Sequence, residues 1–138
     1  MDTSTPVAVR PDMDIQHDLE AVFIHYPPLQ QDRRHVAIRV QSGVVTLTGH
    51  VRTPITRRYL VEHAASVADV VSVEASALHT EEEIRLAAGG LVPDGVMINM
   101  RYGTLILNGS LPPGKSVDEV VAKVAQIPGV DKVVTSFN

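Results

Sequence analysis

The sequence contains no cysteine and no tryptophan, and only 4% of its 138 residues are aromatic. The absence of cysteine excludes disulfides, thiolate metal sites and cysteine nucleophiles. Because aromatic residues are scarce, a core must be built from aliphatic side chains, chiefly valine, leucine, isoleucine and alanine. The formal net charge of −4 argues against general nucleic-acid binding, which needs a basic surface.

Long apolar runs and targeting segments are also missing. No apolar stretch approaches the ~20 residues needed to cross a bilayer as a helix. The opening MDTSTPVAVRPDMD lacks the basic and apolar regions of a signal peptide, and Asp2 stands where N-myristoylation requires glycine. We therefore predict a flexible N-terminal arm over residues 1–11 and a cytoplasmic location.

The sequence does contain an internal repeat. The segment VVTLTGHV (residues 44–51) returns as TLILNGSL (residues 104–111), with a glycine at the same position. Moving the chain by 60 residues superimposes residues 36–73 on residues 96–133 and keeps their apolar positions in register. A repeat of this kind predicts two copies of one structural unit.

The first copy is longer than the second. Upstream of the first predicted strand the offset changes to 65, which leaves five extra residues in the connection LQQDRRH, residues 29–35. We place the units at residues 12–78 and 79–138. A unit of this size buries little surface, so we expect the two units to dock on each other or to be stabilised in a homodimer.

Each copy carries the same order of local signals. For the first copy they predict a helix over residues 14–26 ended by Pro27-Pro28, strands over 36–40 and 44–51, a helix from Thr53, and a strand over 70–77. The turn Ser42-Gly43 suits a tight hairpin. The second copy repeats these signals with capping pairs Thr80/Glu83 and Ser116/Glu119, the turn Tyr102-Gly103, and strands over 104–111 and 130–137.

This order predicts an α+β fold made of two tandem αββαβ units. In each unit a small three-stranded sheet is covered on one face by two helices. The other face of the sheets is expected to be open and polar, with Arg39, Thr46, Thr48, Asn99, Arg101 and Asn108. Unpaired outer strands of such sheets can accept the strand of a partner.

The repeated glycines have a structural explanation. Gly43 and Gly103 follow the residue that begins each hairpin turn, where positive φ is needed. Gly49 and Gly109 lie on the strand face that carries Val45 and the other core residues. We predict that a side chain at these two positions would hold a helix away from the sheet, and we favour packing over ligand contact.

The two copies resemble the BON domain, which is found in osmotically induced bacterial periplasmic proteins and in outer-membrane-associated proteins. The resemblance rests on VAIRVQSGVVTLTGHV…AASVADVVSVEASAL and VMINMRYGTLILNGSL…VAKVAQIPGVDKVVTSFN. The second copy has the family-like PGV before its last strand, whereas the first has ADV. The resemblance implies an α/β sandwich per copy, binding of phospholipid membranes or partner proteins, and no catalytic residues.

Residues with reactive side chains form no catalytic pattern. The six histidines, none of which recurs in the other copy, show no metalloenzyme spacing and are predicted to lie on the surface. Glu81, Glu82 and Glu83 suit the first turn of a helix, where carboxylates complement the helix dipole. No G-x-S-x-G motif is present, and GGLVPDG (residues 89–95) lacks the Lys-Ser/Thr of a phosphate loop. We predict no enzyme activity, no metal site and no cofactor.

One charged group stands out from this background. Six of the 12 lysines and arginines fall between Arg33 and Arg58. If the longer connection folds over the second helix, Arg33, Arg34, Arg57 and Arg58 form a candidate site for a phosphate, a carboxylate or a lipid headgroup. The alternative is a solvated face that neutralises nearby carboxylates at Asp32, Glu62 and Asp69.

The leading interpretation is a non-catalytic binding module that associates reversibly with an anionic phospholipid surface or with a protein partner. Each basic residue contributes on the order of 1 kcal/mol near an anionic membrane, so attachment should be salt-sensitive. A second interpretation is a cytoplasmic interaction or scaffold module that never contacts lipid. A third, a small-ligand or ion sensor, rests on the resemblance alone, because some relatives are linked to osmotic and ionic stress.

Overall fold

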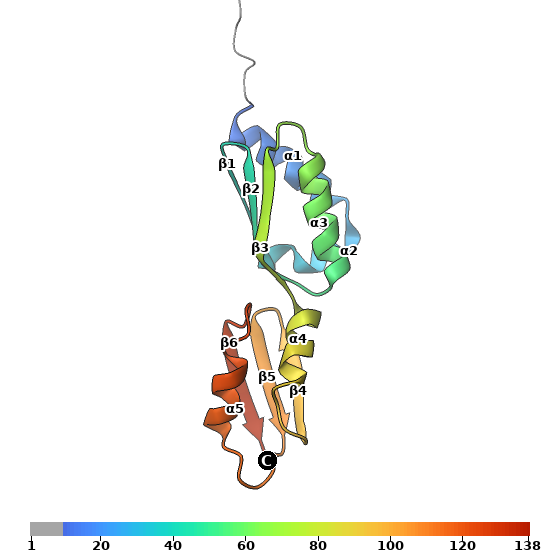
Figure 1. Cartoon of the computed structure of the whole chain (residues 1–138). Coiled ribbons are helices and arrows are strands. Elements are labelled where there is room, and N and C mark those ends of the chain that lie inside the picture. Colours follow the sequence, from blue (N-terminus) through green and yellow to red (C-terminus); the bar gives the residue numbers. More distant parts are fainter. Residues whose placement is uncertain (1–9) are drawn as a thin grey trace, which may run out of the picture.

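The chain forms two units arranged end to end in a computed structural model that describes residues 10–138 (Figure 1). Residues 1–9 of the predicted arm lie outside the described residues. The first unit contains α1 (Asp12–Ile24), α2 (Pro27–Asp32), the 3-10 helix η1 (Arg33–His35), β1 (Val36–Gln41), β2 (Val44–Val51), α3 (Pro54–Ser66) and β3 (Ser72–Thr80). The second contains α4 (Glu81–Gly89), β4 (Val96–Arg101), β5 (Thr104–Gly109), α5 (Val117–Val124) and β6 (Lys132–Phe137).

The two sheets have the same topology. In each, the first two strands form an antiparallel hairpin and the third strand pairs parallel with the second, giving the orders β1-β2-β3 and β4-β5-β6. Their registers differ by the repeat offset, because Val36 pairs with Gly49 and Val96 pairs with Gly109. The α+β class with three-stranded sheets packed against helices is therefore confirmed.

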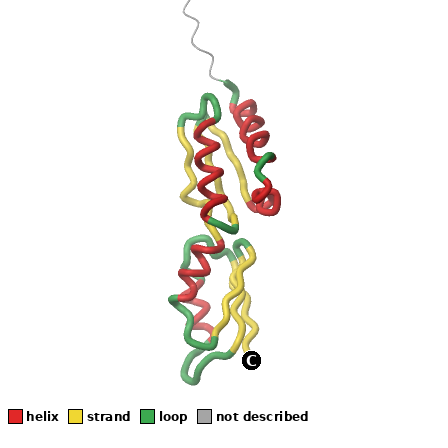
Figure 2. Tube along the Cα trace, turned by 90° about the vertical axis from the view of Figure 1, so that its right-hand side faces the viewer, coloured by secondary structure: helices red, strands yellow, loops and turns green. Residues whose placement is uncertain are grey.

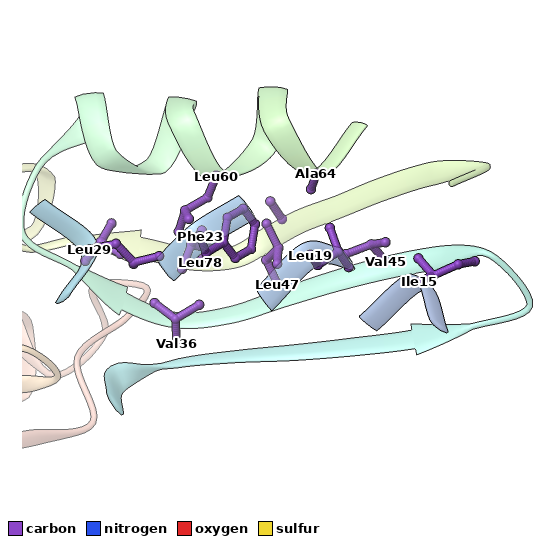
Figure 3. Packing of buried hydrophobic residues seen from close by; sticks show 12 residues of the cluster. Ile15, Leu19, Phe23, Leu29, Val36, Val45, Leu47, Leu60, Ala64 and Leu78 are labelled. Atoms are coloured by element: carbon purple, nitrogen blue, oxygen red, sulfur yellow. The ribbon is translucent and has the colours of Figure 1, made fainter. Parts of the chain in front are cut away.

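Each sheet has one apolar face under helices. In the first unit α1 and α3 lie on the same side of the sheet, and their residues Ile15, Leu19, Phe23 and Leu60 form one buried cluster with Val45 and Leu47 of β2 (Figures 1 and 3). Figure 2 shows the helices of the second unit together on one side of its strands. The first core has 12 buried apolar residues and the second has 7. The smaller second core leaves that unit more dependent on its neighbour.

Three helices, α3, α4 and α5, begin with the side-chain caps that the sequence predicted. The hydroxyls of Thr53, Thr80 and Ser116 accept hydrogen bonds from the main-chain N–H three residues further on, which satisfies an otherwise free helix donor. The first residues of α1 and α4 also bind the hairpin turns: Asp12 accepts from the N–H groups of Ser42 and Gly43, and Glu81 accepts from the N–H of Tyr102. These bonds tie the first helix of each unit to its hairpin turn.

Several boundaries differ from those predicted. Pro27-Pro28 ends α1 but also starts α2, because proline fits the first turn of a helix. The third strands begin two residues later than predicted, and β3 continues to Thr80, past the proposed unit boundary. In the hairpin turns Ser42, Gly43 and Tyr102 have positive φ, whereas Gly103 lies outside the left-handed region. The prediction of positive φ at Gly103 is therefore wrong.

The repeated strand glycines have a different neighbour from the one predicted. Gly49 has a φ of +114°, and a Cβ there would lie 1.9 Å from the carbonyl oxygen of His35. At Gly109, with a φ of +95°, a Cβ would lie 2.3 Å from the carbonyl oxygen of Gly95. The prediction that a helix approaches these glycines is wrong, because the approaching group is the main chain just before the first strand of the same sheet.

Candidate functional site

The four predicted arginines divide into two with internal partners and two without. Arg33 donates to the carbonyl oxygen of Val36 at 2.8 Å and pairs with Glu20 at 3.2 Å. Arg57 donates to the carbonyl oxygens of Leu78 and Ala75, both at 2.8 Å. These two guanidinium groups hold main chain in place, so they are not aimed together at a ligand.

Arg34 and Arg58 are exposed, and neither forms a side-chain hydrogen bond or ion pair with any residue in the described range. Arg34 lies in η1, and Arg58 lies in the second turn of α3. Exposed apolar side chains occur on the same helical layer: Ile55 is one turn before Arg58 and 74% exposed, and Ile24 at the end of α1 is 66% exposed. We call α1, α2, η1 and α3 together the helical layer of the first unit, and this layer therefore presents both cations and apolar groups to solvent.

A recess of about 330 Å³ opens between α1 and α2. Its floor is apolar, because it is formed by the buried side chains of Phe23 and Leu29 and by exposed Ile24. The ion pair between Glu20 and Arg33 borders it. The recess can accommodate an apolar group of modest size.

The connection of residues 29–35, which contains the five extra residues of the first copy, makes contact with the second unit. It lies within α2 and η1, where Asp32 is fully buried and its carboxylate accepts from Arg52 Nε at 2.7 Å and from the Arg52 N–H at 3.2 Å. The Tyr102 hydroxyl, from the hairpin turn of the second unit, donates to Asp32 Oδ1 at 2.9 Å. The Tyr102 ring stacks on His35 with centroids 3.4 Å apart. We call Asp32, Arg52, His35 and Tyr102 the inter-unit cluster.

Burial raises the pKa of Tyr102 above its usual value, and the hydrogen bond to Asp32 adds to this effect. The phenol therefore stays protonated and can donate to the buried carboxylate. Asp32 is one of the carboxylates that the alternative interpretation assigned to a solvated face. Its complete burial shows that it is instead a structural group.

Two histidines lie at the same contact between the units. His50 Nε2 donates to the carbonyl oxygen of Gly129 at 2.6 Å and lies 3.8 Å from Asp131 Oδ2. His79 lies beside it, with ring centroids 5.8 Å apart. Burial lowers the pKa of His79, and the nearby His50 lowers it further. The prediction of surface histidines is therefore wrong for His50, which is buried.

The described part of the chain offers no metal centre, because no three His, Asp or Glu side chains in it are grouped to hold an ion. Nor does any helix among these residues have the length and apolar character needed to cross a membrane.

The sequence contains a signal for the inter-unit cluster. Tyr102 is an aromatic residue at a turn position where the first copy has Ser42, and the extra residues 29–35 occur only in the first copy. Two features that break a repeat are candidates for contact with each other, because neither is needed by the repeated unit itself.

Comparison with known proteins supports this architecture. The protein-family model described as "BON domain" matches residues 12–82 of the chain. No curated protein matches the chain. A solved structure of the C-terminal domain of CdsD, the structural protein of the type III secretion system of Chlamydia trachomatis, is similar, with a TM-score of 0.73 at 16% identity over 93% of this chain and 66% of that one. A second CdsD structure gives 0.69 at 16% identity, over 93% of this chain and 63% of the other. At this identity the likeness concerns the fold alone, and the chain spans about two thirds of the length of those structures.

Proposed function

This chain belongs to the BON domain family, a non-catalytic module often linked to membrane and lipid association, and from that premise we propose that it attaches reversibly to anionic phospholipid surfaces through the helical layer of its first unit. The observation that carries the proposal is the joint exposure of Ile24 and Ile55 with Arg34 and Arg58 on that layer. Surface-bound helices combine apolar side chains, which enter the headgroup region, with cations that contact phosphate.

The energies favour weak attachment. Two arginines supply about 2 kcal/mol near an anionic membrane. Complete burial of an isoleucine is worth about 1.5–3 kcal/mol, and partial insertion is worth less. The net charge of −4 opposes approach to an anionic surface and is screened by salt. The apolar recess beside Ile24 offers further contact area for an acyl chain.

Co-sedimentation with vesicles tests this function. We expect binding to phosphatidylserine-containing vesicles at low salt, little binding to phosphatidylcholine vesicles, and loss of binding at high salt. Arg34→Glu combined with Arg58→Glu should abolish binding without unfolding, because both side chains are exposed. Arg39→Glu is the matched control, since Arg39 is an exposed arginine of the same unit on the open face of the sheet. Absence of binding to anionic vesicles at low salt would remove the lipid function.

A protein partner is the second candidate. It is favoured by the apolar side chains of Met97, Ile106 and Val134 on the uncovered face of the second sheet, where Ile106 pairs with Val134 and Met97 is 62% exposed. A partner that docks there should lose affinity with Met97→Glu and keep it with the double arginine variant. This pattern separates the candidate from lipid attachment.

A further inference from the structure

The outer edges of the two third strands differ although the two sheets share one topology. β3 and β6 are both edge strands, each paired only with the strand before it. An exposed strand edge carries unpaired N–H and C=O groups that can pair with another chain, and proteins commonly cover such edges. The comparison of β3 with β6 therefore shows where the chain covers an edge and where it does not.

In the first unit two side chains and a bulge cover the edge of β3. Arg57 donates to the carbonyl oxygens of Ala75 and Leu78 at 2.8 Å each. Glu74 accepts from the N–H of Ser76 at 3.1 Å. The pairing of β2 with β3 shifts register between Thr46 and Thr48, which marks the bulge. Each device blocks the addition of a further strand.

In the second unit these devices are absent. The buried positions Leu60 and Ala64 of α3 correspond to Val120 and Val124 of α5, so Arg57 corresponds to Val117. Glu74 corresponds to Val134 by strand register. Both valines are exposed, at 37% and 38%. Across residues 10–138 no side chain hydrogen-bonds to the main chain of β6, and β5 pairs with β6 without a shift in register.

The direction of the free groups on β6 follows from its bonds to β5. The N–H of Lys132 donates to the carbonyl oxygen of Gly103, and the N–H of Asn138 donates to the carbonyl oxygen of Gly109, both in the β4–β5 hairpin. In a parallel pair the residues alternate, so the main-chain groups of Val133, Thr135 and Phe137 point away from β5. Thr135 is exposed, whereas the corresponding Ala75 under Arg57 is buried. The open edge is thus a row of three residues with free donors and acceptors.

We propose that this edge pairs with β6 of a second copy of the chain, antiparallel about a two-fold axis at Thr135, so that the two sheets become one of six strands. In that register Thr135 faces its own copy and Val133 faces Phe137 of the second copy, and the three pairs form about six main-chain hydrogen bonds. Lys132 faces Asn138, so no like charges meet. This self-complementarity, together with the exposed valines, favours a second copy over an unrelated strand.

The proposal does not depend on lipid attachment, and its test contains no lipid. Sedimentation velocity of the full chain from micromolar to millimolar concentration should show a dimer that grows with concentration. Val117→Arg combined with Val134→Glu gives the edge of β6 the arginine and glutamate that Arg57 and Glu74 supply at the edge of β3. We expect this double variant to lose the dimer. The matched control is Leu86→Arg with Met97→Glu, which makes the same types of change at exposed sites of α4 and β4 and should leave the dimer intact.

Amide hydrogen exchange of the unmodified chain provides a second test, which holds even if the double variant misfolds. Val133, Thr135 and Phe137 should exchange slowly only at concentrations where the dimer forms, whereas Val134 and Ser136, which bond to β5, should be protected at every concentration. A chain that stays monomeric throughout, a dimer that survives the double variant in its folded form, or concentration-dependent protection confined to another strand would each overturn the proposal.

Discussion

Tyr102→Phe removes one hydroxyl from the inter-unit cluster and keeps the ring that stacks on His35. The Tyr102 hydroxyl donates to Asp32 Oδ1 at 2.9 Å, and Asp32 is fully buried, so the lost bond is made to a charged acceptor that water does not reach. Hydrogen bonds to charged groups contribute about 1.5–3 kcal/mol. Because Tyr102 is half-buried and Arg52 still pairs with Asp32, we expect the lower value, about 1.5 kcal/mol, in the free energy of unfolding.

The assay is urea and thermal denaturation followed by circular dichroism. A loss of about 1.5 kcal/mol in a chain of this size lowers the melting temperature by about 5 °C. Tyr59→Phe is the matched control, because Tyr59 stacks on Tyr26 with centroids 3.7 Å apart but its hydroxyl has no hydrogen bond to other described residues. For the control we expect the free energy of unfolding to change by less than ~0.5 kcal/mol, as is usual for substitutions that remove no specific interaction. Equal effects of the two substitutions would refute the role given to the Asp32–Tyr102 bond.

Two further predictions concern the fold itself. Gly49→Ala should lower the free energy of unfolding by about 3 kcal/mol or more, because the new Cβ would lie 1.9 Å from a carbonyl oxygen at a residue with positive φ. Gly114 also has positive φ but has open space around it, so Gly114→Ala should lower the free energy of unfolding by only about 1–2 kcal/mol. Urea unfolding of both variants measures this difference. The pKa of His79, which faces His50, Asp131, Arg57 and Glu83, is depressed, so the folded state favours the neutral ring, and the stability this gives is full above pH ~6.5 and is lost as pH falls toward the lowered pKa. We therefore expect His79→Gln to lose less stability on acidification than the unmodified chain in a pH series of urea melts. An unchanged pH dependence would contradict this account.

The repeated part of the fold could be predicted because its signals are local. Capping residues such as Thr80 and Ser116, the alternating strand at residues 44–51 and the turn at Ser42 act within a few residues of the chain. The structure accordingly follows the predicted element order and the 60-residue register.

The candidate site could be predicted less well because its contacts are long-range. The sequence shows Arg57 as one charge in a run, but not that β3 presents two carbonyl oxygens within its reach. It also cannot show that the residues around Asp32 meet a tyrosine 70 positions away. The convergence of four arginines was therefore a prediction from composition, and the geometry leaves only Arg34 and Arg58 exposed for a ligand.

The central claim, that the helical layer of the first unit contacts anionic lipid, is tested most directly by fluorescence, because the chain contains no tryptophan. Ile55→Trp places an indole at an exposed position of that layer, and Met97→Trp places one on the open face of the second sheet. We predict that phosphatidylserine-containing vesicles at low salt shift the emission of Ile55→Trp to shorter wavelength and leave that of Met97→Trp unchanged. An unchanged spectrum for Ile55→Trp, or a shift for Met97→Trp alone, would contradict the account.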